Sequence, residues 1–167
     1  MAGDTTDLVI SRAVLEHIKD PSSVFAEINR VLKPGGKFIF LVPNLWDYVS
    51  LFSLLIPNRY HGFLVSKTEG RHVDDVFPAY YKANTYRSIR KLTERNNFRI
   101  SSFQYLSQYP SSFMFSPILF LIGVVYERLI SNVNALRFLR PWILATLEKR
   151  SHRVTIQRIF FNCNHLH

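Results

Sequence analysis

The chain has 167 residues, enough for one domain with a buried core. Its content of 47% apolar and 20% charged residues is ordinary for a globular protein. A single cysteine, Cys163, excludes an internal disulfide and favours a reducing compartment. No basic-then-apolar signal peptide opens the sequence, so we expect a cytoplasmic location.

The net charge of +9 is unevenly distributed along the chain. Residues 1–83 carry nine basic and nine acidic side chains, whereas residues 84–167 carry twelve basic and three acidic ones. This basic, aromatic-rich second half predicts an anionic partner: a membrane surface, a phosphorylated substrate or nucleic acid. Nucleic acid is the least favoured of the three, because the aromatic residues lie in apolar runs rather than between Lys and Arg.

The first predicted element is a strand followed by a helix. Leu8–Ile10 is a short apolar run, typical of a strand buried on both faces. Asp20 can cap a helix whose first residue is Pro21, where proline is favoured. The helix then has one apolar stripe, formed by Val24, Phe25, Ile28, Val31 and Leu32.

A glycine turn and a second strand follow. Lys33–Gly36 ends the helix and turns the chain, and residues 37–42 form a β-rich run. Strand, helix and strand within residues 7–44 predict a βαβ unit with a right-handed crossover and parallel strands. In open α/β sheets ligands bind beyond the carboxyl ends of strands, so residues 11–19 and Pro43–Asn44 are candidate site segments.

These residues resemble a known family. SRAVLEHIKDP, EINRVLKPGGKF and LVPN are similar, at fixed spacing, to the second half of class I S-adenosylmethionine-dependent methyltransferases of the type 11/12 kind. A later run, FPAYYKANT, resembles a segment that precedes the next helix in one bacterial branch of the family. The resemblance implies an α/β fold: a partial Rossmann-like sheet, made of the last strands of the doubly wound fold, with a final antiparallel strand.

The resemblance also implies S-adenosylmethionine as cofactor. The family's G-x-G-x-G loop, and the acidic residue that holds the ribose, have no counterpart before Asp7 in the printed sequence. We therefore expect the chain to be the C-terminal half of the domain, as a fragment or part of a split protein. Weak or no cofactor binding by this chain alone is the expected consequence.

The family's cofactor and catalytic positions fall in the loop after the first strand. The resemblance places the backbone of Ser11 and Arg12 near the methionine part of the cofactor, and Glu16 among the cofactor contacts at the rim of the site. Histidine is the side chain that most often acts as a general base, so His17 is the candidate general base. The alternative for Glu16 and His17 is that both are solvated loop residues.

Three further residues are candidate substrate contacts. The resemblance assigns Asn44 to the substrate pocket, but an Asx-type turn or helix cap explains this residue slightly better. Tyr80 and Tyr81 lie near the substrate entrance in the family, and ordinary packing explains them equally well. The acceptor is expected to be a small molecule, or a lipid or glycan.

Residues 45–83 predict an apolar helix, Leu45–Ile56, and then a long lid-like loop. The loop's histidines and aspartates lack a metal-ligand spacing, so we expect no metal site. Residues 84–106 predict a helix and a strand. Asn84 or Thr85 caps this helix, and Phe98–Leu106 alternates as a strand after an Asn-rich helix end. The helix's inner face is expected to consist of Tyr86, Ile89 and Leu92.

Residues 107–150 predict a helical hairpin that is both apolar and basic, broken near Ser131–Asn132 or Pro141. Its longest apolar run, Phe113–Tyr126, is too short to span a bilayer. The hairpin is interpreted as a cap over the sheet or an oligomer interface, with an interfacial membrane helix pair as the alternative. Residues 151–167 predict the final strand, at Val154–Phe161, and a polar tail.

Two classes of function remain. The first is an S-adenosylmethionine-dependent methyltransferase. The second is a non-catalytic module, derived from such an enzyme, that binds an anionic membrane surface or mediates oligomerisation. A truncated sheet would leave the first strand as an exposed apolar edge, so we also expect self-association through this edge.

Overall fold

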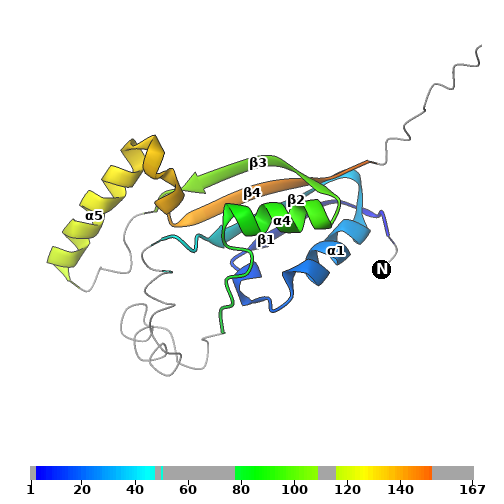
Figure 1. Cartoon of the computed structure of the whole chain (residues 1–167), viewed down its shortest axis with the longest axis horizontal. Helices are drawn as coiled ribbons and strands as arrows, with labels where there is room; N and C mark the ends of the chain where they lie inside the picture. The colour runs from blue at the N-terminus through cyan, green and yellow to red at the C-terminus, as the bar shows by residue number, and fades with distance from the viewer. Residues whose placement is uncertain (1–2, 48–49, 51–77, 109–115, 152–167) are drawn as a thin grey trace, which may run out of the picture.

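The computed structural model describes residues 3–47, 50, 78–108 and 116–151. The strands are β1 (Thr6–Arg12), β2 (Leu32–Pro43), β3 (Phe98–Leu106) and β4 (Trp142–Lys149). The helices are α1 (Pro21–Val31), α4 (Tyr86–Arg95), α5 (Pro117–Asn132) and the short 3-10 helices η1 (Leu15–His17) and η4 (Asn134–Leu139). The described strands form one mixed sheet in the order β1-β2-β4-β3 (Figure 1), in which the neighbours β1 and β2 pair in parallel and β4 pairs antiparallel with both β2 and β3.

The predicted βαβ unit is confirmed. Asp20 caps α1, and its side chain accepts hydrogen bonds from the backbone N–H groups of Ser22 and Ser23. Helix α1 returns the chain so that β2 lies beside β1 in parallel, with Val9 opposite Phe38. The first part of β2 needs glycine at position 35, because Gly35 has a φ of +80°.

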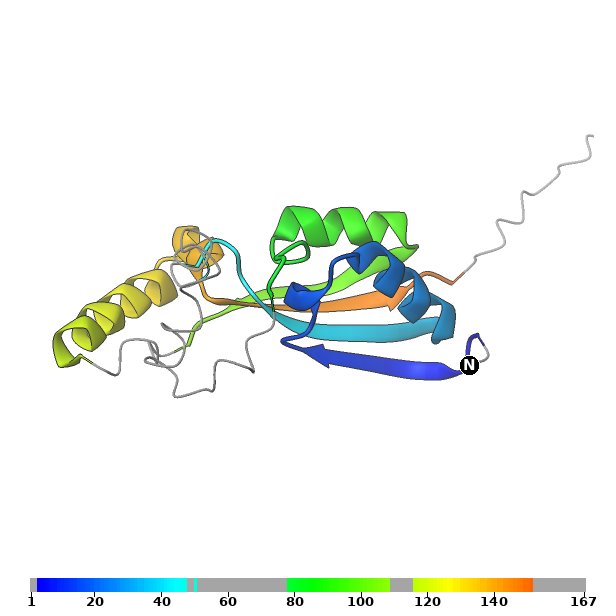
Figure 2. The same ribbon diagram turned by 90° about the horizontal axis from the view of Figure 1, so that it is seen from below.

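The core lies on one face of the sheet. Helices α1 and α4 both cover this face (Figure 2). Phe25 from α1 packs edge-on against Phe38, Phe40 and Phe98, with ring centroids 5.5, 5.9 and 6.3 Å away. Each such pair contributes about 0.5–1.5 kcal/mol beyond its buried area. The apolar stripe predicted for α1 therefore packs the crossover helix against core residues of two strands, β2 and β3.

The expectation that Leu8–Ile10 is buried on both faces is wrong. Leu8 is 46% exposed and Ile10 is 68% exposed, because side chains alternate along a strand and Val9, between them, is the one that packs against the core. Strand β1 forms one end of the described sheet. The exposed apolar edge that we expected for the first strand is thus present among the described residues.

Helix α4 and strand β3 agree with the prediction. Thr85 caps α4 in a capping box with Ser88, and Asn97 adopts the left-handed conformation just after the helix, with a φ of 55°. Ile89 and Leu92 are buried as expected. Tyr86 is half exposed and packs edge-on against Phe103, with ring centroids 4.9 Å apart.

The prediction for the end of the chain is wrong in one respect. Helix α5 ends at Asn132, where the break was predicted, but the apolar pattern beyond it does not continue as a helix. Trp142–Lys149 is instead strand β4, antiparallel between β2 and β3. Ile143, Ala145 and Leu147 point into the core, which is the alternation of a strand. The final strand expected at Val154–Phe161 lies outside the described residues.

Most of the predicted helix Leu45–Ile56, and nearly all of the lid-like loop, also lie outside the described residues. Among the residues that are described, no helix combines the length and the hydropathy needed to cross a bilayer.

Candidate functional site

The candidate site lies where β1 and β2 end, at the same edge of the sheet (Figure 1). The backbone N–H of Ala13, just after β1, donates to the carbonyl of Leu41 in β2 over 2.9 Å. Ala13 has a φ of 52°, a left-handed conformation that is costly for a residue with a side chain. This turn directs the chain from β1 into η1 and so places Glu16 and His17 beyond the carboxyl ends of both strands.

Glu16 is a buried residue rather than a solvated one, with 5% of its surface exposed. Its backbone carbonyl accepts from the N–H groups of Tyr80 and Tyr81, over 2.6 and 3.2 Å. Burial raises the pKa of its carboxyl group, although a hydrogen bond from its own backbone and the charge of His17 oppose this. Its Oε2 atom has no hydrogen-bond partner among the described residues.

His17 is held in one tautomer. Its Nδ1 lies 3.1 Å from the carbonyl oxygen of Pro78, and because a carbonyl can only accept, Nδ1 is the nitrogen that carries the proton. In the neutral imidazole the lone pair is then on Nε2, the atom that would take a proton from a substrate. The solvated-loop interpretation of His17 does not account for this fixed orientation.

Tyr80 and Tyr81 are brought against the same loop. The Lys19 ammonium lies 5.7 Å from the centroid of the Tyr80 ring, a cation–π distance, and Lys82 donates to the carbonyl of Lys19 over 2.6 Å. Tyr81 has a φ of 50°. Two residues in left-handed conformations, Ala13 near the N-terminus and Tyr81 near the middle of the sequence, therefore border the site.

Asn44 has a structural role in this arrangement. Its side chain is fully buried, and its amide nitrogen donates to the carbonyls of Phe138 and Arg140 over 2.6 and 2.8 Å. Its amide oxygen accepts from the N–H of Trp46 in an Asx-type turn. These contacts match the turn interpretation of Asn44 and tie the end of β2 to the segment before β4. Its role as a substrate contact stays a prediction.

Ser11 and Arg12 are in the positions expected for the end of the first strand. Ser11 is half-buried opposite Phe40, and Arg12 is exposed opposite Leu41. Their backbone therefore borders the same edge as Glu16 and His17. Their contacts with a cofactor stay a prediction.

Sequence reasoning missed two buried polar residues near this edge. Asn84 donates to the carbonyl of Pro43 over 2.7 Å, and its own carbonyl accepts from Leu45, so it joins the Tyr80–Tyr81 segment to the end of β2. Glu127 of α5 is buried beside the end of β3. The available signal for Glu127 was a single acidic residue within an otherwise apolar helix.

Comparison with known proteins points to methyltransferases. A family model described as a methyltransferase domain matches residues 1–40. Dimethylglycine N-methyltransferase from Parasynechococcus marenigrum is 36% identical over 84 residues, which is 50% of this chain and 26% of that protein. The chain thus spans about a quarter of the length of this curated relative.

Solved structures share the fold at low sequence identity. An S-adenosylmethionine-dependent methyltransferase from Mesorhizobium loti has a TM-score of 0.53 and 15% identity, over 89% of this chain and 64% of that one. An S-adenosylmethionine-dependent methyltransferase from Methanosarcina mazei has a TM-score of 0.52 and 16% identity, over 89% and 61%. With its mixed sheet and crossover helix, the chain has the class I S-adenosylmethionine-dependent methyltransferase fold and carries the last strands of that doubly wound sheet.

Proposed function

We propose that this chain takes part in S-adenosylmethionine-dependent methyl transfer to a small-molecule acceptor, or to a lipid or glycan. The observation that best supports the proposal is the meeting of the Glu16–His17 loop with Tyr80 and Tyr81 beyond the carboxyl ends of two parallel strands. The name of the relative from Parasynechococcus marenigrum makes dimethylglycine the first acceptor to test.

Glu16 fits a cationic cofactor. A buried carboxylate with an unpartnered oxygen and a raised pKa is stabilised when a positive charge approaches it. S-adenosylmethionine would supply a methyl group on a positively charged sulfur, and it also carries an ammonium group. In the proposed arrangement Glu16 binds this charge, while the backbone of Ser11 and Arg12 borders the methionine part of the cofactor.

His17 and the two tyrosines would act on the acceptor side. Because Nδ1 of His17 donates its proton to the carbonyl of Pro78, Nε2 is the nitrogen that can take up a proton. His17 would therefore remove a proton from a methyl acceptor that needs to lose one. Tyr80 and Tyr81, which the Glu16 carbonyl holds in place, would orient the acceptor, and Asn44 would support the pocket wall.

Cofactor binding can be tested by NMR titration of the amide groups of residues 11–17. We expect S-adenosylmethionine to shift these signals more strongly than S-adenosylhomocysteine, whose sulfur is neutral. Glu16→Gln should remove most of the difference, because it removes the carboxylate that senses the charge. The matched control is Glu94→Gln on the exposed face of α4. Equal responses to both compounds in the wild type would contradict the role of Glu16.

Methyl transfer can be tested with a second protein that supplies the first half of the domain. We would mix this chain with the N-terminal half of the dimethylglycine N-methyltransferase domain and follow transfer of a labelled methyl group to dimethylglycine. If His17 acts as a base, His17→Asn should lower the rate by about 10²–10⁴-fold. No transfer to any amine, hydroxyl or glycan acceptor in the mixture would argue against the proposed function.

Membrane attachment is the second candidate, and the outer face of α5 favours it. Five large apolar side chains at helical spacing are exposed there: Ile118, Leu121, Ile122, Val125 and Leu129. The excess of basic residues in the second half of the chain would attract an anionic surface. We expect the chain to float with phosphatidylserine vesicles and not with phosphatidylcholine vesicles. Leu121→Glu should abolish flotation, whereas Leu8→Glu, at an exposed position on β1, should not.

A further inference from the structure

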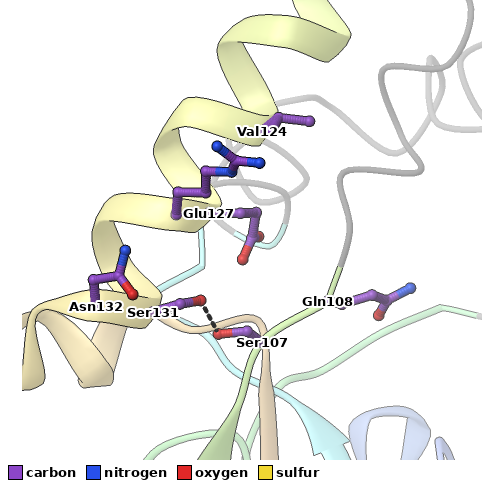
Figure 3. Close-up of a pocket in the computed structure, with 7 residues that line it drawn as sticks. Ser107, Gln108, Val124, Glu127, Ser131 and Asn132 are labelled. Atoms are coloured by element: carbon purple, nitrogen blue, oxygen red, sulfur yellow. Dashed lines mark hydrogen bonds between the residues drawn. The ribbon is translucent and has the colours of Figure 1, made fainter.

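A pocket of about 380 Å³ lies between α5 and the residues that follow β3. Ser107 and Ser131 meet at its base through a hydrogen bond of 2.7 Å, and Gln108 and Val124 form parts of its wall (Figure 3). Because β3 runs in the same direction as β1 and β2, the pocket lies at the same edge of the sheet as Glu16 and His17.

Glu127 projects into this pocket from α5 (Figure 3). Its surface is only 8% exposed, and its Oε2 atom has no hydrogen-bond partner among the described residues. The backbone N–H of Gln108 faces the carboxyl group and favours its charged form, which lowers its pKa a little. A buried carboxylate oxygen without a donor is costly, so its presence in a mostly apolar helix points to a ligand that donates.

The charges around Glu127 favour a cation. Burial, followed by repulsion from the buried carboxylate of Asp47, raises the pKa of Glu127 to about 7. On the same helix, burial raises the pKa of the Tyr126 phenol, and Arg128 is an exposed residue of the pocket lining.

The nearby Arg140 does not compensate this negative charge directly. Its guanidinium group donates to the carbonyls of Ile130, Tyr105 and Ser131 over 2.9–3.3 Å. These contacts engage it with the backbone rather than with the carboxyl group of Glu127. Among the residues that line the pocket, Glu127 is the acidic one and Arg128, which is exposed, is the basic one, while Ser107, Gln108, Ser131 and Asn132 are neutral and polar.

We infer that this pocket binds a small protonated amine, whose N–H group donates to Oε2 of Glu127. The hydroxyl groups of Ser107 and Ser131 and the side chain of Asn132 offer acceptors for further N–H groups. A metal ion is a poorer fit, because no three His, Cys, Asp or Glu side chains among the described residues gather as metal ligands. An anion would be repelled by Glu127 and Asp47.

The test is an NMR titration of the whole chain at pH 8 and constant ionic strength. Butylammonium chloride is the probe, and 1-butanol is its neutral counterpart of similar size. We expect a saturable shift of the Gln108 amide with butylammonium and not with 1-butanol. Glu127→Gln should weaken this binding at least tenfold, whereas Glu94→Gln on the surface of α4 should leave it unchanged.

A second measurement uses the wild type alone and does not depend on how the variant folds. At pH 5.5 most of the Glu127 carboxyl groups are protonated, while butylammonium stays charged, so binding should be at least tenfold weaker than at pH 8. Equal responses to butylammonium and 1-butanol, or binding that is the same at both pH values, would overturn the inference. A stronger Gln108 shift with MgCl₂ would overturn it in favour of a metal site.

Amine binding does not require methyl transfer, so the inference and the proposed function can fail separately. Binding of butylammonium without any transfer activity would support the pocket alone. Transfer to dimethylglycine that Glu127→Gln leaves unchanged, together with no butylammonium binding, would support the proposed function alone.

Discussion

Glu127 is expected to make the stability of the chain depend on pH. Its pKa rises from 4.5 to about 7 on folding, so between these values the folded chain binds more protons than the unfolded one. The free energy of unfolding should therefore fall as the pH rises through this window, by at most about 3 kcal/mol. Glu127→Gln should remove most of this loss, and urea unfolding at pH 5 and pH 8 measures it. A wild-type chain equally stable at both pH values would contradict the prediction.

Asn44 is expected to be important for stability whatever its part in substrate binding. Asn44→Ala removes a fully buried amide that donates to two carbonyls, those of Phe138 and Arg140, and should lower the free energy of unfolding by about 1–3 kcal/mol. Asn44→Asp keeps an oxygen for the N–H of Trp46 but places a carboxylate against the two carbonyls, so it should cost at least as much. Urea unfolding measures both variants. If Asn44 only contacted substrate, both variants would be as stable as the wild type, and that result would contradict the prediction.

Residues whose partners are close in the sequence could be predicted, and those with distant partners could not. The cap at Asp20 uses N–H groups two and three residues away, so the local sequence predicts it. Asn84 bonds to Pro43, 41 residues away, and Asn44 bonds to carbonyls beyond residue 137. The burial of Glu16 likewise depends on a segment about 60 residues further along the chain.

The two glycines in the first part of β2, where its register with β1 shifts, affect how well the two parallel strands can pair. A Cβ atom on Gly36 would lie 2.9 Å from the carbonyl oxygen of Lys33 and 3.2 Å from that of Asp7 in β1. We expect Gly36→Ala to lower the free energy of unfolding by about 1–3 kcal/mol through this overpacking. Gly35→Ala should cost about 1–2 kcal/mol, because Gly35 has space around it and only its positive φ resists a side chain. Urea unfolding of both variants measures the costs, and stability equal to wild type in both would contradict this account of the two glycines.

Strand β4 shows why one element was assigned wrongly. Trp142, Ile143, Leu144 and Leu147 are apolar on both faces of the strand, which hides the period of two that would distinguish it from a helix. The α1 stripe has no such ambiguity, because its outer positions are polar. β4 is defined by its two neighbours, β2 and β3, which lie about 40 to 100 residues earlier in the chain. Its assignment therefore depends on tertiary pairing rather than on local pattern.

At the scale of the whole molecule, the resemblance predicted an antiparallel strand beside the parallel pair, and β4 lies beside β2 in this way. The parallel β1–β2 pair followed from the βαβ pattern, and the antiparallel strand beside it followed from the family. The antiparallel strand was predicted at Val154–Phe161, whereas the strand beside β2 is Trp142–Lys149. Both segments near the C-terminus have apolar character, so the pattern alone does not distinguish them. The fold class could thus be predicted from residues 7–44. The pocket beside α5 could not be predicted, because it forms by packing between segments and no sequence motif indicates it.

The outer edge of β1 predicts self-association of the 167-residue chain. Ala13 donates to β2, and N–H groups alternate along a strand, so the N–H groups of Leu8 and Ile10 point away from β2. This edge carries two exposed apolar side chains, and it can pair with the same edge of a second copy.

Sedimentation velocity should therefore show a sedimentation coefficient that rises with protein concentration. Ile10→Pro should suppress this rise, because it removes an outward N–H group while sparing the bonds to β2. Ile10→Ala is the matched control: it removes a similar apolar surface but keeps the N–H group, and it should retain more of the association. Thermal unfolding followed by circular dichroism checks that both variants are folded. A wild-type chain that stays monomeric at all concentrations, or equal effects of the two substitutions, would show that pairing through the β1 backbone does not drive association.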